Sequence, residues 1–276
     1  MRDLQALLEG ELAAAGKPRP TKAVLAVAGP IDGDRVALTN RAWSFSIAKL
    51  KLALKLKRLV VMNDFAAVAQ SLLELKSNDL LRIGGGAGEQ DGNLLACGPG
   101  TGFGVAALVR TRRPPLALAS EAGHMMLGPA TAEEAQILAR MSAPRPLVVE
   151  HLLSGPGLAR LHEALTGQTL SSDQVVSNAK AQDPAALSAI AAFLRIFGRM
   201  AGDLALAFDA RGGVYFAGGL GRALAPFFSR SPFRAAFEDH PTYRERLAAI
   251  PTAVIVHPSP ELLGGLTVML GSNRRK

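Results

Sequence analysis

Short apolar runs alternate with helical segments along almost the whole of this chain. Runs such as residues 23–28 (AVLAVA) and 58–62 (RLVVM) have the length and apolar content of buried strands. Alternation of this kind predicts an α/β protein with a mixed sheet. The predicted strands cover residues 23–28, 36–40, 58–62, 80–83, 93–97, 103–110, 213–217 and 252–257, and the predicted helices cover 3–15, 47–56, 65–75, 131–141, 156–165, 185–208 and 261–270.

The composition is that of a globular protein with one large or two ordinary domains. Hydrophobic residues make up 49% and charged residues 20% of the 276 residues. Cys97 is the one cysteine, so neither an intramolecular disulfide nor a multi-cysteine zinc site can form. No uninterrupted apolar run reaches the roughly 20 residues of a membrane span, and the first residues lack a signal-peptide core. We therefore expect a cytoplasmic protein with no membrane segment.

The formal net charge of +8 raises the question of a nucleic-acid partner. The basic residues are scattered along the chain instead of forming a block. The two tyrosines and one tryptophan are few for a base-stacking surface. The charge therefore favours attraction of anionic nucleotides over binding of nucleic acid.

Asn63 and Asp64 follow the apolar run 59–62 directly. Polar side chains at the end of a buried strand lie at the sheet edge where ligands usually bind. A carboxylate there can accept a hydroxyl proton, and the neighbouring amide can hold the hydroxyl in place. The same dipeptide is also common in turns and at helix caps, so a structural role stays open.

Two glycine-rich turns could hold phosphate groups. Gly98, Gly100 and Gly102 lie between two predicted strands, where converging backbone N–H groups and the hydroxyl of Thr101 could bind an anion. Gly218 and Gly219 follow the predicted strand 213–217 and precede a helix, so a flat or bulky ligand could approach the backbone closely. A tight hairpin and a plain helix-entry turn remain the alternatives.

Three further side chains could bind hydroxyl groups. Glu121 and His124 lie three residues apart in a segment flanked by apolar residues, and Glu150 also has apolar neighbours. Buried or half-buried acids need hydrogen-bond partners, and sugar hydroxyls are suitable ones. Metal binding by these three residues lacks a recognised motif, and a surface or capping role for either acid stays open.

Taken together, these segments resemble the bacterial glucokinases. The matching segments occur in the family's order and read AVAGPIDGDRVALTNRAWSFSI, VVMNDFAAVA, GPGTGFGVA, EAGH, EHLLSGPGL, YFAGG and SPFRAAFED. The resemblance implies the ATP-dependent type of the hexokinase–actin–Hsp70 superfamily. The related zinc-containing repressor-and-kinase sugar kinases carry a cysteine cluster after the histidine, which this chain lacks.

The resemblance implies a role for each sugar-site candidate. Asp64 matches the family's catalytic base, which accepts the proton of the glucose 6-hydroxyl. Asn63 matches the residue that hydrogen-bonds the sugar beside the base. Glu121, His124 and Glu150 fall on the family's other glucose-contacting positions. The substrates implied are therefore glucose and ATP.

The resemblance also assigns the two glycine turns to ATP. Gly98, Gly100, Thr101 and Gly102 match the family's second phosphate loop, and Gly218 with Gly219 matches its adenosine motif. Mg²⁺ is the implied charge-neutralising ion, because phosphoryl transfer depends on positioning and charge neutralisation. A homodimer is implied by the family alone.

The implied fold is the two-domain ribonuclease H-like or actin-type ATPase fold. The expected small domain combines residues 1–74 and 257–276, and the expected large domain is 75–256. The family's opening strand and its phosphate loop Asp-x-Gly-Gly-Thr-Asn have no counterpart in this chain. By analogy with the family, the segment without a counterpart is roughly 40 residues long, about what three strands and their turns require.

We therefore expect the first strands of the small domain to be missing, which would leave open sheet edges and favour self-association. A late-called start or a fragment is the preferred explanation. A non-catalytic sugar-binding or regulatory relic of a sugar kinase is the alternative.

Overall fold

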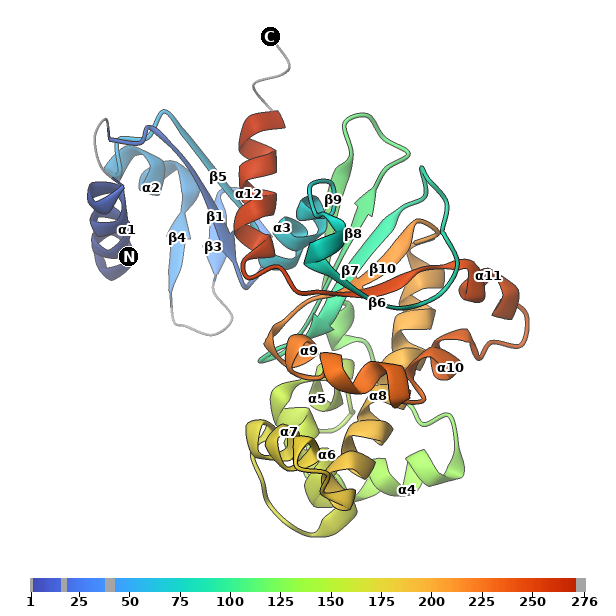
Figure 1. Cartoon of the computed structure of the whole chain (residues 1–276). Helices are drawn as coiled ribbons and strands as arrows, with labels where there is room; N and C mark the ends of the chain where they lie inside the picture. Colours follow the sequence, from blue (N-terminus) through green and yellow to red (C-terminus); the bar gives the residue numbers. More distant parts are fainter. Residues whose placement is uncertain (1, 16–18, 38–42, 272–276) are drawn as a thin grey trace. The chain divides into compact units, whose positions relative to one another are not determined.

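The computed structural model describes residues 2–15, 19–37 and 43–271, and the chain divides into two compact units (Figure 1). The first unit combines Met1–Glu74 with Ser259–Lys276, and the second unit is Leu75–Pro258. The second unit therefore ends at Pro258, two residues after the end expected from the sequence, which was residue 256.

The first unit contains two small sheets. In one, β1 (Lys22–Val27) pairs in parallel with β5 (Arg58–Asn63). The other is an antiparallel sheet of three strands, β2 (Ile31–Asp32), β3 (Arg35–Ala37) and β4 (Ser44–Ser46). The helices are α1 (Arg2–Ala14), α2 (Ile47–Ala53), α3 (Asp64–Ser71) and α12 (Pro260–Gly271).

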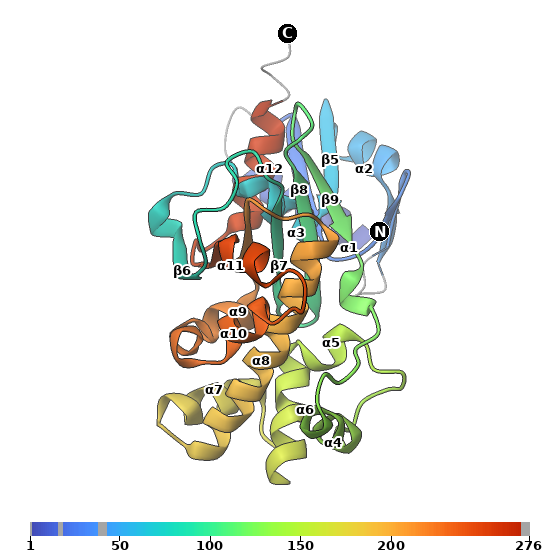
Figure 2. The ribbon, with the colours of Figure 1, turned by 90° about the vertical axis from the view of Figure 1, so that its right-hand side faces the viewer.

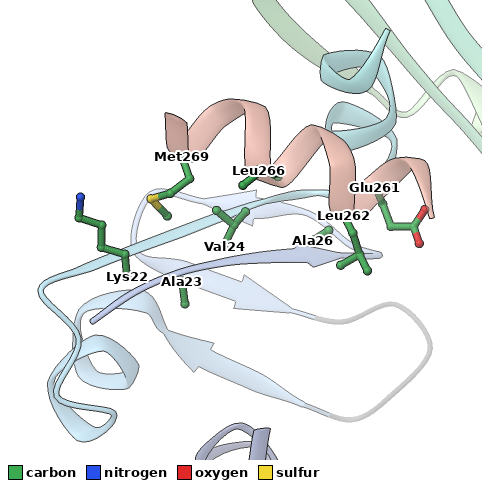
Figure 3. Close-up of a pocket in the computed structure, with 9 residues that line it drawn as sticks. Lys22, Ala23, Val24, Ala26, Glu261, Leu262, Leu266 and Met269 are labelled. Carbon is green, nitrogen blue, oxygen red and sulfur yellow. The ribbon is translucent and has the colours of Figure 1, made fainter. Parts of the chain in front are cut away.

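A small apolar core joins α1, α2 and the three-stranded sheet to one face of the β1–β5 pair. Ala23, Leu25 and Val27 of β1 pack against this core while partly buried. Val24 and Ala26 lie on the opposite face of β1, toward α12 (Figure 3), because successive strand side chains point to opposite faces. The buried members of the core are Leu4, Val36, Phe45, Leu50, Leu54 and Leu56.

An apolar groove of about 260 Å³ lies between β1 and α12. Figure 3 shows Val24 of β1 beneath Leu266 of α12, with Met269 to one side and Leu262 to the other, near Ala26. Leu262 and Leu266 are 69% and 53% exposed. In the described part of the chain, β5 is the one strand that pairs with β1. One edge of the strand and one apolar stripe of the helix are therefore uncovered there.

The second unit is built on one mixed sheet of six strands. Its strands are β6 (Leu80–Gly84), β7 (Leu94–Pro99), β8 (Phe103–Val109), β9 (Leu116–Ser120), β10 (Gly213–Phe216) and β11 (Thr252–Ile255). They lie in the order β6-β11-β10-β7-β8-β9. β7, β10 and β11 are parallel, and the outer pairings are antiparallel. All six residues of β7 are buried.

The longest helix, α8 (Pro184–Ala207), forms the centre of this unit's core, as predicted. Its Phe197 ring packs edge to face on Phe103, Phe216 and Phe233 at centroid distances of 5.8, 4.9 and 5.4 Å. Among the described helices, α8 alone is long and apolar enough to cross a membrane, but 61% of its apolar window is buried inside the fold.

The remaining helices of the second unit are short. α4, α5, α6 and α7 gather near one end of α8 (Figure 2). The short helices are α4 (Ala132–Arg140), α5 (Val149–Leu152), α6 (Gly155–Thr166), α7 (Ser172–Lys180), α9 (Gly219–Ala223), α10 (Phe233–Glu238) and α11 (Arg244–Ala249). The 3₁₀ turns are η1 (Ser77–Asp79), η2 (Ala122–His124) and η3 (Ala225–Arg230).

Most predicted elements are present, with ends that differ by a few residues. Thr131 and Ser154 cap α4 and α6, and Gly167 ends α6 in a left-handed conformation with φ 74°. The sequence did not predict the strands β2, β4 and β9, the helices α5, α7, α10 and α11, or the 3₁₀ turns η1, η2 and η3. The predicted strand 36–40 is described only through β3, since its residues 38–40 lie outside the described residues.

Candidate functional site

Asn63 and Asp64 form the junction between β5 and α3. Asn63 caps the helix, because its Oδ1 accepts a hydrogen bond from the Ala66 N–H at 3.1 Å. Asp64 is the first residue of α3, and its Oδ1 accepts the Phe65 N–H at 2.8 Å. Asn63 therefore has the structural role of a helix cap, which the sequence left open. It is compatible with ligand binding, since the cap uses Oδ1 and the amide also carries the donor Nδ2.

Gly98 and Pro99 end β7, and residues 100–102 form the tight turn to β8, so the loop is a hairpin as predicted. Gly100 borders open space, because an added Cβ would meet nothing within 4 Å. Thr101 is exposed. Within the part of the chain that the structure describes, the N–H groups of Thr101 and Gly102 donate to no protein acceptor. Two adjacent backbone donors of this loop are thus available to an anion.

The second glycine turn packs directly on the hairpin. Gly218 has φ 98°, and a Cβ there would come within 3.0 Å of the Pro99 carbonyl oxygen. Ala217 donates its N–H to the Cys97 carbonyl at 3.0 Å. Gly219, at the start of α9, borders open space like Gly100. The structure therefore brings together the two turns that the sequence analysis assigned to a nucleotide.

Glu121, His124 and Glu150 form a second cluster in the same unit. The His124 Nε2 atom lies 3.8 Å from Glu121 Oε2, and its Nδ1 atom lies 3.8 Å from Glu150 Oε1. The other oxygen of Glu150, Oε2, accepts the Phe103 N–H at 3.3 Å. Phe103 is the first residue of β8, so the cluster adjoins the hairpin. Two carboxylates and an imidazole thus present acceptors and a donor to one small region.

The two acids differ in burial, and Glu121 has the surface position that the sequence left open. The side chain of Glu150 is 32% exposed, but that of Glu121 is 68% exposed. Glu121 directly precedes the single turn η2 and makes no side-chain capping hydrogen bond; Ala122 and Gly123 of the turn are buried while the flanking acid stays on the surface. Among the described residues, no group of three or more His, Cys, Asp or Glu side chains is arranged to hold a metal ion.

Two contributors were missed by the sequence analysis. The Phe103 backbone holds the Glu150 carboxylate, and Gly123 packs beneath it, since a Cβ on Gly123 would come within 3.0 Å of the Phe103 carbonyl oxygen. The glycine between Glu121 and His124 was the available signal, but its partner is 20 residues away in sequence. Asn63 and Asp64 belong to the first unit, and the other candidate residues belong to the second.

Known proteins match nearly the whole chain. The family model for glucokinase matches residues 2–271. A glucokinase of Aromatoleum aromaticum is 42% identical over 262 residues, which are 92% of this chain and 79% of that protein. The chain belongs to the glucokinase family. A second relative, the glucokinase of Nitrobacter hamburgensis, is 43% identical over 254 residues, 89% of this chain and 79% of that protein.

Solved glucokinase structures have the same fold. The crystal structure of a glucokinase from an Antarctic psychrotroph superimposes with a TM-score of 0.86 at 32% identity, over 97% of this chain and 86% of that one. The glucokinase of Balamuthia mandrillaris, in complex with glucose, has a TM-score of 0.81 at 22% identity, over 97% and 83%. A ROK hexokinase from Thermus thermophilus has a TM-score of 0.71 at 19% identity, over 99% and 88%. The last two likenesses concern the fold alone.

Membership of the glucokinase family confirms the resemblance and the α/β fold of the actin-like ATPase type. It makes the chain an ATP-dependent sugar kinase, which is a phosphotransferase. The alternative of a non-catalytic sugar-binding relic is not favoured, since relatives with this similarity over about nine-tenths of the chain are glucokinases.

Proposed function

We propose that this chain transfers the γ-phosphoryl group of ATP to the 6-hydroxyl of D-glucose, giving glucose 6-phosphate and ADP at the entry to glycolysis. Family membership supports this reaction. The structural observation that carries the proposal is the meeting of two kinds of site in one unit. Glu150 and His124 offer hydroxyl-binding groups, and they adjoin a glycine hairpin with available N–H donors.

Asp64 is the proposed catalytic base. Its place at the first turn of α3 favours the ionised carboxylate, because the helix dipole stabilises negative charge there. An ionised carboxylate can accept the proton of the 6-hydroxyl as the phosphoryl group is transferred. Asn63 is the proposed donor to the same hydroxyl region through Nδ2.

Glu121, His124 and Glu150 are the proposed partners of the remaining sugar hydroxyls. Carboxylates accept hydrogen bonds from hydroxyl groups, and the imidazole can donate one. The Phe103 N–H fixes one oxygen of Glu150. A fixed carboxylate binds an oriented hydroxyl with less loss of conformational entropy than a mobile one.

The two glycine turns are the proposed ATP site. Thr101 and Gly102 supply backbone donors for phosphate oxygens. Gly98 and Gly100 complete the loop, in which the Gly100 N–H donates to the Gly102 carbonyl at 2.9 Å. Gly218 and Gly219 supply a close approach for the adenosine. The open space beside Gly100 and Gly219 supports this assignment, since a side chain at either position would fill it.

Mg²⁺ is proposed to enter with ATP. Mg²⁺ in kinases is usually held by substrate phosphate oxygens with one or two carboxylates, so it would be bound chiefly through ATP. When bound, the ion neutralises negative charge on the phosphates and thereby assists their transfer.

The decisive experiment measures ADP production by the 276-residue chain with glucose and MgATP. We expect glucose-dependent turnover that Asp64→Ala abolishes, while the variant still binds glucose in a thermal-shift titration. Turnover that survives in Asp64→Ala would contradict the role of Asp64. A folded wild-type chain that releases no ADP under these conditions would contradict the proposed activity of this chain.

The two units are proposed to be the small and large domains of the kinase. The uncovered edge of β1 and the exposed Leu262 and Leu266 support the expectation that the first strands of the small domain are missing from the sheet. A chain extended upstream should then be more soluble and more active than the 276-residue chain, and equal behaviour of both would contradict it.

A cytoplasmic homodimer that binds neither membranes nor nucleic acid completes the proposal. The homodimer rests on the family resemblance. Light scattering at micromolar concentration should give twice the monomer mass of 28.9 kDa. A mass that stays at the monomer value would overturn the dimer.

A further inference from the structure

The backbone conformation at Gly102 is one that residues with a side chain can also adopt. Gly102 lacks the positive φ that makes Gly85, Gly88 and Gly218 unfavourable positions for other residues. The neighbouring Gly100 is not crowded either, since an added Cβ there would meet nothing within 4 Å. A different constraint must therefore apply at Gly102.

The constraint at Gly102 is the Glu150 carboxylate. A Cβ on Gly102 would come within 3.0 Å of Glu150 Oε2 and 3.4 Å from its Cδ. Real Cβ atoms essentially never approach an atom so closely. Apart from Gly102 itself and its two chain neighbours, no other residue has an atom within 4 Å of that Cβ, so the conflict concerns this one carboxylate.

Glu150 would yield before the backbone does. Its carboxylate is the end of a flexible side chain that is 32% exposed, so a rotation relieves the conflict at little cost in stability. The Phe103 N–H cannot move with the Glu150 carboxylate, because Phe103 is held by its own packing. The Phe103 ring is buried and packs on Phe197 at 5.8 Å, and Gly123 abuts the Phe103 carbonyl.

We propose that Gly102 is a positioning residue for sugar binding: its missing side chain keeps the Glu150 carboxylate on the Phe103 N–H. This inference rests on the proposed role of Glu150 and gives the hairpin a second task besides phosphate binding. A side chain at Gly102 displaces Oε2 by roughly 1 Å, and Oε1, which faces His124, moves with it. The loop that contacts the nucleotide thereby also sets the sugar-binding geometry.

The test compares Gly102→Ala with Gly128→Ala. Like Gly102, Gly128 has no positive φ, but an added Cβ there would meet nothing within 4 Å, and the residue lies outside the proposed binding machinery. Displacing one hydrogen-bonding carboxylate should raise the glucose Kd and KM about tenfold in Gly102→Ala. Gly128→Ala should leave both unchanged. If Gly102→Ala raised the KM for ATP but not for glucose, the positioning role would be wrong.

A double-mutant cycle separates positioning from general damage. In a Glu150→Ala background the added methyl at residue 102 has nothing to meet, so Gly102→Ala should change the glucose Kd less than about twofold. An equal loss in both backgrounds would overturn the proposal. Glucose Kd is measured by isothermal titration on chains of verified fold.

The thermal midpoint of unfolding gives a readout that needs no ligand. If Gly102→Ala lowers the midpoint or prevents folding, Glu150→Ala should restore it, because the clash is removed. Misfolding in both backgrounds would overturn the proposal. Wild-type chain that binds no glucose would instead contradict the proposed function, while the midpoint cycle would still decide the contact between residues 102 and 150.

Discussion

β5 of the first unit and β7 of the second are both apolar strands that end at residues proposed to bind ligands. Every residue of β5 is only half-buried, whereas all six residues of β7 are buried. β5 belongs to a pair of strands, and β7 lies inside a sheet of six. The end of a strand can therefore present polar groups both in a two-stranded and in a six-stranded sheet. The burial that stabilises the strand differs greatly between the two.

The cores of the two units differ in the same direction. Among the described residues, the core cluster around α1 and α2 of the first unit buries six apolar side chains, and the second unit buries a much larger cluster that includes Phe193, Phe197, Phe216 and Phe233. Small cores supply little stabilisation relative to chain entropy. We infer that the second unit is the more stable of the two, and that the first unit opens more readily.

The largest expected effect separates the chemical roles of the two units. Asp64→Asn keeps the shape of the side chain but removes the base, so kcat should fall by about 10²–10⁴-fold with little change in the KM for glucose. Glu150→Gln should chiefly raise the KM for glucose, by about tenfold. Steady-state kinetics at varied glucose measure both. Asp32→Asn, at an exposed position of the first unit, is the control expected to leave both constants unchanged.

A reversed pattern would break the comparison. If Asp64→Asn raised the KM for glucose and left kcat intact, the first unit would bind sugar without supplying the base. A kcat loss in the Asp32→Asn control would mean that any change of charge in this unit disturbs turnover.

The next effect concerns the cores. Phe197→Ala removes a ring that packs on five others, so it should cost about 3–5 kcal/mol in the unfolding of the second unit. Leu50→Ala, in the smaller core, should lower only the transition of the first unit. Urea unfolding followed by circular dichroism should resolve two transitions, with the first unit at lower urea. A single shared transition moved equally by both variants would show that the units unfold together.

Much of the fold could be predicted because strands and helices here have strong local signals. β1, β5, β7 and α8 are long apolar segments bounded by glycine or polar residues, and all were predicted. β9 was missed because its sequence LALAS is equally suited to a helix, and pairing with β8 decides its conformation. β2 is two residues long and has no periodicity to detect.

The positions of candidate residues could be predicted where these residues directly follow an apolar strand in the sequence. Asn63 with Asp64 and the two glycine turns follow apolar strands, so their places at strand ends were readable from the chain. The exposure of Glu121 was not, since it depends on how η2 lies on the second unit. The closeness of Gly102 to Glu150 was also hidden, because only the folded chain brings positions 102 and 150 together.

The smallest effect uses Cys97 as a reporter for the second unit. This single cysteine lies in β7, is fully buried, and burial raises the pKa of its thiol, so the reactive thiolate is scarce at pH 8. Alkylation should be slow in buffer and stay slow at urea concentrations that already unfold the first unit. It should accelerate only with the transition that Phe197→Ala displaces, as followed by mass spectrometry with Cys97→Ala as the blank. Rapid alkylation in buffer would mean that β7 opens as easily as β5, and the contrast between the units would then fail.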